Sequence, residues 1–408
     1  MDNKPAKSKT RNIGFCSGRN GFAISIMLCA VVMLLVIGAG VMTFGLHSRR
    51  FAVQTSSEIT ARFAADSGLT KAYYEMNEKL KVTPWNDSGL PEGTDEELPN
   101  TDATYSYVVT GNLDSGYNVE STGKHVLRQK TVRCSLPLQG LFEYAIFGDE
   151  YIHIKNGGTI DWYNNDGDDG NLRIGTNNIL ADSIILRNGA LVNGDVVIGA
   201  GGDPDVVIDY AGGTLTGNTF IMPEEYELPQ ITVPLWLEAL PSGGTITNNI
   251  TLSSSAKYDN IKLSNNKIIT IDGPVSLYII GDIILKNSAE MRIIDGNDVF
   301  LNLYVGGNID IDNSSAINNL TEDATVLKIY GLEGCESIIL KNSIDFYGAV
   351  YAPNANIVMM NSGDVFGSAI GKSVDQKNSA DFNYDVSLKE VSIEEEGVRF
   401  VIKQWQEE

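Results

Sequence analysis

Hydrophobic residues follow two helical patterns in the first eighty positions. Residues 21–46 carry no charge and are mainly Ile, Leu, Val, Met, Ala and Gly, which is long enough for a bilayer span of about 20 apolar residues. Beyond them, apolar residues recur at mostly three- and four-residue steps as far as Leu80, as in an amphipathic helix. No proline lies between Pro5 and Pro84, so one helix is predicted over residues 22–81. It would extend roughly 90 Å, far more than a bilayer requires, so its outer half must pack on something else; a plain membrane anchor followed by a juxtamembrane helix is the alternative.

The pattern changes after this helix. Residues 82–103 contain three prolines, two glycines and an acidic run with little periodicity, which predicts a surface linker. Residues 104–140 read as three strands separated by Gly-containing turns, a small antiparallel β region. Residues 386–408 are expected to form a C-terminal strand or tail.

A repeated unit dominates residues 141–385. A short apolar strand that ends in Asn plus a small residue recurs, with steps of 26, 29 and 19 residues between its last four copies. Such spacing suits the coils of a parallel β-helix, whose corners Asn tolerates because it adopts the left-handed conformation. A β-sandwich with Gly/Asn hairpins is the alternative, but it does not explain the recurrence. The corner residues are predicted to be structural: Asn188, Asn287, Asn313, Asn342 and Asn361.

These patterns predict a mainly β protein. A long N-terminal α-helix, transmembrane in its first half, precedes a small antiparallel β region and a right-handed parallel β-helix-like domain. Five Lys/Arg residues precede the apolar run, so the N-terminus is expected in the cytoplasm and the body outside it, in a single-pass topology. A secretory signal peptide fits less well, because its apolar stretch is shorter and ends at an Ala-x-Ala-like site.

The formal net charge of −22 argues against nucleic-acid binding, because an acidic body repels phosphate and no basic stripe with aromatics is present. The three histidines are scattered, so no triad or zinc site is predicted. Asp310 and Asp312 share one strand face without a convincing catalytic base and are interpreted as a solvated surface. No catalytic residue is predicted.

Two weaker candidate sites remain. The run at residues 164–171 could hold calcium through Asp166, Asp168 and Asp169, although the EF-hand spacing and its terminal Glu are missing. A solvated acidic loop is the alternative. Cys134 and Cys335 could pair in an oxidising compartment or remain two lone buried thiols. No other cofactor is expected.

Residues 19–22, Arg-Asn-Gly-Phe, resemble the type IV prepilin processing site. The resemblance implies cleavage between Gly21 and Phe22 by a prepilin peptidase. Residues 61–72, ARFAADSGLTKA, resemble the corresponding stretch of PilX-type minor pilins, and the Tyr-x-Val-x-Ser-Thr-Gly segment at 117–123 is similar to those proteins. Major pilins carry Glu at the fifth mature position, where this chain has Ile26, so the resemblance implies a minor, tip-like position.

Segments at 159–164, 193–199, 346–355 and 382–385 resemble a β-helical domain of unassigned function that follows PilX-like N-termini. The resemblance implies a pilus assembly protein of the bacterial inner membrane or of the pilus at the cell surface, with other pilins and the inner-membrane assembly machinery as partners. The implied division is a leader at 1–21, a helix at 22–81, a linker at 82–103, a pilin-like β region at 104–140, a β-helical domain at 141–385 and a C-terminal strand or tail at 386–408.

The function expected from these observations is a non-enzymatic minor-pilin-like structural protein of a type IV pilus or related filament. Its helix would insert in the filament or minor-pilin complex, and its β-helix would be exposed for assembly, adhesion or surface contact. The alternative is a membrane-anchored extracytoplasmic β-helix that binds or cleaves polysaccharide. A self-stacking scaffold resembling bactofilins is a third possibility.

Overall fold

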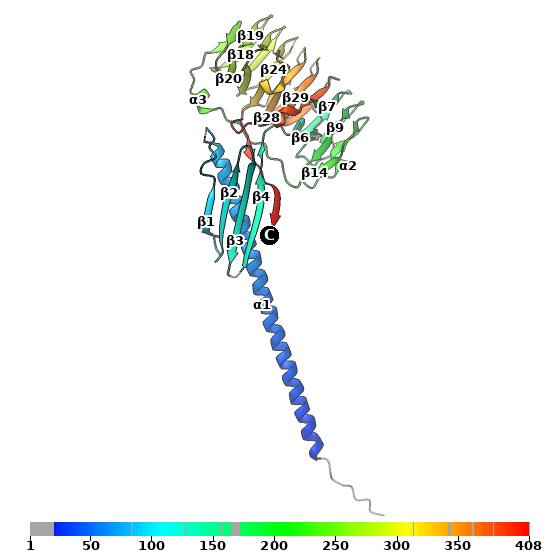
Figure 1. Cartoon of the computed structure of the whole chain (residues 1–408). Helices are drawn as coiled ribbons and strands as arrows, with labels where there is room; N and C mark the ends of the chain where they lie inside the picture. Colours follow the sequence, from blue (N-terminus) through cyan, green and yellow to red (C-terminus); the bar gives the residue numbers. More distant parts are fainter. Residues whose placement is uncertain are drawn as a thin grey trace, which may run out of the picture. The chain divides into compact units, whose positions relative to one another are not determined.

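The computed structural model describes residues 20–82, 84–126, 128–155, 157–164, 172–312, 314–341, 344–360, 363–377 and 379–407. The chain divides into two compact units (Figure 1). The helix–sheet unit comprises Met1–Glu75, Ser88–Ser135 and Lys403–Glu408, and the solenoid unit comprises Met76–Asp87 and Leu136–Ile402. The solenoid is therefore inserted in the sequence of the helix–sheet unit, before its last strand.

The helix–sheet unit is built on one long helix, α1 (Asn20–Leu80), the blue helix of Figure 1. The predicted long apolar N-terminal helix is confirmed. Small residues on one face of its second half are buried, namely Ala61, Ala64, Ala65 and Ala72. Small side chains allow a strand to approach the helix backbone closely, and this face packs on an antiparallel sheet.

That sheet contains strands in the order β1-β2-β3-β4-β32. Its bounds are Glu92–Glu97 (β1), Thr104–Asn112 (β2), Gly116–His125 (β3), Arg128–Leu136 (β4) and Lys403–Glu407 (β32). β2 pairs antiparallel with β1 and β3, and β32 pairs antiparallel with β4. The three strands expected within residues 104–140 are confirmed as β2, β3 and β4.

The expected linker is wrong for part of its range, since Glu92–Glu97 form the edge strand β1. This strand is mostly exposed and lacks the apolar alternation that marks a half-buried strand. It is held instead by backbone pairing with β2 and by an ion pair between Lys71 Nζ and Glu96 Oε2 at 2.6 Å. Neither contact leaves a local sequence signal.

The solenoid unit is a stack of parallel strands, so the parallel β-helix-like prediction is confirmed and the hairpin sandwich is wrong. Ile, Leu and Val side chains fill its interior. Its first segment contains β6 (Ile146–Ile154), β7 (Thr159–Tyr163), β8 (Arg173–Gly175), β9 (Ile184–Leu186), β10 (Leu191–Val192), β11 (Asp195–Ile198), α2 (Pro204–Val207), β12 (Ile208–Asp209), β13 (Thr214–Leu215) and β14 (Thr219–Ile221).

A second segment continues after α3 (Leu235–Glu238). It contains β15 (Thr245–Ile246), β16 (Ile250–Leu252), β17 (Ala256–Tyr258), β18 (Asn260–Ser264), β19 (Ile268–Ile271), β20 (Pro274–Ile279), β21 (Ile283–Lys286), β22 (Glu290–Ile293), β23 (Phe300–Val305), β24 (Ile309–Ile311), β25 (Ala316–Asn319), η1 (Ala324–Val326), β26 (Leu327–Gly331), β27 (Ser337–Leu340), β28 (Phe346–Met359), β29 (Val365–Gln376), β30 (Phe382–Asp385) and η2 (Val386–Lys389). Separately, β5 (Leu138–Gln139) and β31 (Arg399–Phe400) pair antiparallel.

The coils do not stack in chain order. The chain enters the stack at β6 and winds through β8 and β11 to β14 at one end. After residues 222–244 it resumes at the other end and winds from β17 through β20, β23 and β26 to β28. Finally β29, paired with β28, pairs parallel with β6 and joins the two segments. In Figure 1 the orange-red β29 lies beside the teal β6 for this reason.

Residues 222–244 pack on the outside of the coils in a second hydrophobic cluster. Met222, Ile231 and Leu237 lie there with aromatic residues of both solenoid segments. The Tyr351 hydroxyl donates a hydrogen bond to the Pro229 carbonyl oxygen at 2.8 Å. The crossing segment is therefore fixed along the stack by apolar burial as well as by chain connectivity.

Two of the predicted Asn corners can be compared with the backbone. Asn188 has φ 56° and Asn287 has φ 55°, both in the left-handed region that Asn tolerates. The small residues that follow them, Gly189 and Ser288, are also left-handed, with φ 85° and 61°. Asn313, Asn342 and Asn361 lie outside the described residues.

Candidate functional site

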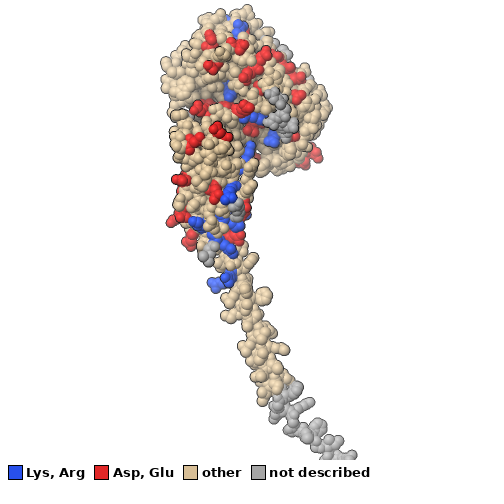
Figure 2. All heavy atoms as spheres, in the orientation of Figure 1, with Lys and Arg blue, Asp and Glu red and all other residues tan. Residues whose placement is uncertain are grey.

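The first half of α1 exposes its apolar side chains all round the helix. Exposed fractions include 70% for Ile24, 69% for Leu34 and 82% for Phe44, and α1 is long and apolar enough to cross a membrane. Figure 2 shows this half of the helix without acidic or basic side chains on the face in view. A continuous apolar surface of this kind marks a membrane or protein interaction site.

The predicted processing site lies at the start of this helix. Gly21 and Phe22 fall within the first turn of α1, and residues 1–19 of the leader lie outside the described residues. Ile26, at the fifth position counted from Phe22, is 58% exposed. It therefore belongs to the same uncovered apolar surface.

The two segments that resemble pilins contact each other. A Cβ added at Gly123 of β3 would lie 2.0 Å from the Ala61 carbonyl oxygen and 2.4 Å from the Ala65 nitrogen. The buried Ser121 hydroxyl donates to the Ala65 carbonyl oxygen at 2.7 Å. A Cβ added at Gly68 would lie 2.3 Å from Ser121 Oγ. Small residues, Gly, Ala and Ser, thus allow the helix and strand backbones to approach closely.

Charged contacts surround this packed face. Lys130 Nζ lies 3.3 Å from Glu58 Oε1 and 3.4 Å from Glu407 Oε1, and Arg62 also reaches Glu407 at 3.4 Å. The Tyr107 hydroxyl donates to Glu75 Oε2 at 2.8 Å. Burial, and then the hydrogen bond to the Glu75 carboxylate, raises the pKa of Tyr107. The C-terminal strand is thereby tied to α1 as well as to β4.

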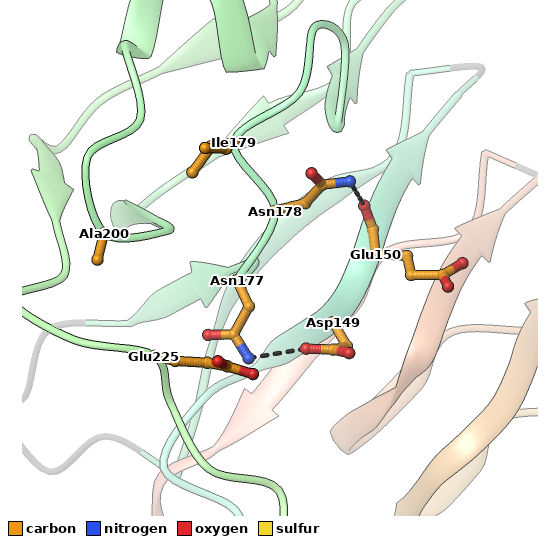
Figure 3. Close-up of a pocket in the computed structure, with 7 residues that line it drawn as sticks. All are labelled: Asp149, Glu150, Asn177, Asn178, Ile179, Ala200 and Glu225. Carbon is orange, nitrogen blue, oxygen red and sulfur yellow. Dashed lines mark hydrogen bonds between the residues drawn. The ribbon is translucent and has the colours of Figure 1, made fainter.

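One surface pocket of the solenoid unit, about 450 Å³ in volume, carries three acids. In Figure 3 the carboxylates of Asp149 and Glu225 lie on either side of the Asn177 amide, whereas Glu150 points away. Asn177 Nδ2 donates to Asp149 Oδ1 at 2.7 Å, and Asn178 Nδ2 donates to the Glu150 carbonyl oxygen at 2.7 Å. Both amides therefore already donate hydrogen bonds within the solenoid unit. The pocket residues include no His, Cys, Lys or Arg that would serve as a catalytic base.

The other candidate residues from the sequence do not come together in one site. Asp310 pairs with Lys286 at 3.1 Å and Asp312 with Lys341 at 3.2 Å, as half-exposed ion pairs between neighbouring coils. His153 of β6 stacks on Tyr151, and burial followed by nearby Lys155 lowers the pKa of its imidazole. Within the described ranges no group of three or more His, Cys, Asp and Glu is placed to hold a metal ion.

The structure describes the two candidate cysteines but not the candidate calcium ligands. Cys134 belongs to the helix–sheet unit and Cys335 to the solenoid unit, and both are buried free thiols. Their pairing stays a prediction, and two lone thiols stay its alternative. Burial raises the pKa of each to about 11. The proposed calcium ligands Asp166, Asp168 and Asp169 lie outside the described residues.

Comparisons with known proteins match parts of this architecture. Residues 243–391 match the model of a domain of unknown function (DUF7305), which covers coils from β15 to η2. Among solved structures, the competence-associated pilin ComZ from Thermus thermophilus is similar over 86% of this chain and 97% of that chain, with 13% identity and a TM-score of 0.22. No curated protein matches the chain. Because a TM-score of 0.22 establishes no equivalence of position, the function is inferred from the contacts of this chain itself.

Proposed function

We propose that this chain is a non-enzymatic pilin-like structural subunit of a type IV pilus or related filament. One observation carries the proposal: a single helix is apolar and uncovered in its first half, and is packed on an antiparallel sheet in its second half. Lipid covers such a surface before assembly, and the helices of neighbouring subunits cover it afterwards. A plain membrane anchor would not require the helix to continue into a folded unit.

Processing belongs to the same proposal. A prepilin peptidase removes residues 1–21, and Phe22 becomes the N-terminus of a single-pass protein of the bacterial inner membrane, with its body outside the cytoplasm. Ile26 supplies no carboxylate for the amine of a neighbouring subunit, and an unpaired charge in lipid is costly. The chain is thus suited to a minor, tip-like position and not to the bulk of the filament.

The solenoid is the exposed part in this proposal, used for assembly, adhesion or surface contact. The division into leader, helix, pilin-like β region and β-helical domain follows the sequence boundaries given above, with β1 and β32 added to the pilin-like sheet. The partners are other pilins, reached through α1, and the inner-membrane assembly machinery. No step of this role needs a cofactor.

Co-purification tests the role directly. The tagged full chain is isolated in mild detergent from cells that express a complete pilus system, and pilins are identified in the eluate by mass spectrometry. We expect other pilins with the wild-type chain and fewer with Gly21→Val, which blocks processing. Gly14→Val in the same leader is the matched control and should retain them. Absence of pilins from the wild-type eluate would refute the role.

A further inference from the structure

Residues at or just beyond the ends of neighbouring strands of the solenoid line a groove of about 510 Å³, here called the turn groove. β7, β10 and β13 pair side by side in parallel, so the ends of these three strands lie at one corner of the stack. The residues that line the groove are Asp161, Trp162, Asn193, Gly194, Asp195, Thr216, Gly217 and Asn218. The groove lies entirely within the solenoid unit.

Two buried polar atoms of this groove lack a partner. Asp195 is 4% exposed, and its Oδ1 accepts a hydrogen bond from the Asn218 nitrogen at 2.8 Å. Its Oδ2 has no hydrogen-bond partner among the described residues, and neither does Trp162 Nε1. Buried polar atoms in native structures normally have a partner in the protein, in ordered water or in a ligand.

Both residues line the same groove, so the hydrogen-bonding capacities of the two atoms indicate the chemistry of a ligand there. Asp195 Oδ2 accepts hydrogen bonds, whereas the Trp162 indole N–H only donates them. A metal cation would satisfy the carboxylate alone. An anion would satisfy the indole alone and would be repelled by Asp161 and Asp195. A hydroxyl group donates and accepts, so a ligand rich in hydroxyl groups satisfies both.

A half-exposed row of side chains continues from the groove across the junction of the two segments. Strand register places Tyr347, Phe366, Asn383 and Asp161 at equivalent positions of β28, β29, β30 and β7. Asn193 follows on the next coil, where its Nδ2 donates to Asp161 Oδ2 at 2.9 Å. We call these residues the aromatic–polar strip. With strands about 4.8 Å apart, its four steps span roughly 19 Å.

The aromatic end of the strip offers two half-exposed apolar rings, Tyr347 and Phe366. The rings of Tyr347 and Phe366 stack with centroids 4.5 Å apart and an interplanar angle of 9°. Tyr163 packs edge-on against Phe366 at 4.8 Å. Aromatic faces beside a few convergent polar groups are the usual composition of a specific ligand site. Sugar rings combine apolar C–H faces with hydroxyl edges and match this composition.

We propose that the aromatic–polar strip and the turn groove bind an uncharged polysaccharide chain. Sugar rings pack against the half-exposed rings of Tyr347 and Phe366, and hydroxyl groups in the groove donate to Asp195 Oδ2 and accept from Trp162 Nε1. The proposal rests on the surface-contact role proposed above and gives that role a ligand class. An acidic chain with a net charge of −22 disfavours polyanionic glycans.

The test uses the full chain in detergent and two neutral probes, dextran and hydroxyethyl cellulose, in affinity gel electrophoresis. We expect at least one polymer to retard the chain and to change its tryptophan fluorescence. Asp195→Asn should weaken binding by about tenfold or more, because hydrogen bonds to a charged group are stronger than those to a neutral one. Phe366→Ala should weaken binding by about the same factor, because it removes one of the two aromatic rings on which the sugar packs. Trp162→Phe keeps the ring and should remove most of the fluorescence change.

Matched controls lie elsewhere on the solenoid. Phe300→Ala removes a half-exposed ring of β23, and Asp272→Asn removes an exposed acid; both should leave binding unchanged. Circular dichroism melting of every variant verifies folding, and Phe366 is half-exposed, so its loss spares the core. Binding of neither polymer would overturn the proposal, as would binding that the strip and groove variants leave intact. Occupation of the groove by Ca²⁺ or polygalacturonate instead would overturn it too.

The two proposals fail separately. A chain that begins at Phe22 and co-purifies with pilins, yet binds neither polymer, contradicts only the polysaccharide site. A chain that binds dextran through Phe366 but is never processed contradicts only the filament role.

Discussion

At the scale of single residues, the contact between α1 and β3 depends on the absence of side-chain atoms. Gly123 faces the helix backbone itself, and Ser121 bonds to the carbonyl oxygen of Ala65. Backbone atoms cannot rotate away as a flexible side chain can. Any added atom at Gly123 must therefore separate the helix from the sheet.

Gly123→Ala should loosen the helix–sheet unit. We expect a loss of about 1–3 kcal/mol, the usual cost of overpacking, since the new Cβ would lie 2.0 Å from the Ala61 oxygen. Hydrogen exchange of the β2 and β3 amides measures it, and protection should fall about tenfold for each 1.4 kcal/mol. Asn118→Ala, on the exposed face of β3, should have little effect. Equal protection in both variants would contradict the close contact.

Glu396 gives a prediction of pH dependence. Burial raises its pKa, and a hydrogen bond from Tyr304 only partly offsets this. With the pKa raised in the folded state, the unfolded chain ionises first as pH rises, so stability falls until the folded carboxyl has also ionised. Glu396→Gln should therefore melt at a higher temperature than wild type at neutral pH, but not at about pH 3, below the ordinary Glu pKa of about 4.3.

Thermal melts at the two pH values measure this difference. Glu394→Gln, at an exposed neighbouring position, is the control and should follow wild type at both. A stabilisation of Glu396→Gln that is the same at both pH values would show that the carboxyl charge is not its cause.

The backbone conformation at two corners of the solenoid could be predicted from the sequence. Asn188 and Asn287 were assigned to corners because Asn tolerates a left-handed backbone, and both adopt it. Asp195 and Trp162 were missed as a site. Both lie inside segments singled out for their resemblance to a β-helical domain, but only parallel stacking brings those segments to one corner.

At the scale of elements, the two halves of α1 differ in what covers them. Its second half is an amphipathic helix on a sheet, and its first half is uncovered and apolar throughout. Sequence periodicity was sufficient to predict both, because helical patterns are local. β1 could not be predicted in this way, since an exposed acidic edge strand has no apolar alternation.

A charge in the first half of α1 should weaken membrane association. Val36 is 67% exposed, and Val36→Asp places a carboxylate near the middle of the span at a cost of about 2.5–3.5 kcal/mol. We expect a smaller membrane-bound fraction in vesicle flotation. Val36→Ala and Val108→Asp, the latter on β2, are controls and should float like wild type. Unchanged flotation of Val36→Asp would contradict insertion of this segment.

At the scale of the whole molecule, the solenoid closes by joining segments that are remote in sequence. The repeat spacing predicted parallel coils but not the order in which they stack. All repeats are similar, so the sequence of a repeat does not determine which other coil lies next to it. The order depends on the pairing of β29 with β6 and on the crossing segment at residues 222–244. The junction should couple the two segments energetically.

A double-mutant cycle measures that coupling. Val374 of β29 and Ile152 of β6 are register partners and are fully buried. Each change to Ala should destabilise the solenoid unit, and the pair should deviate from additivity by about 0.5–3 kcal/mol. Ile152→Ala with Ile293→Ala, on a distant coil, should be additive within about 0.5 kcal/mol. Additivity in both cycles would contradict the joined stack.

The proposed pilin-like role depends most on whether the leader, residues 1–21, is cleaved from the chain. The most direct measurement is Edman sequencing, supported by intact mass, of the chain recovered from membranes of cells that contain a prepilin peptidase. We predict a mature chain that begins at Phe22 and is absent when the peptidase is deleted. A membrane form that still begins at Met1 in the presence of the peptidase would contradict the account.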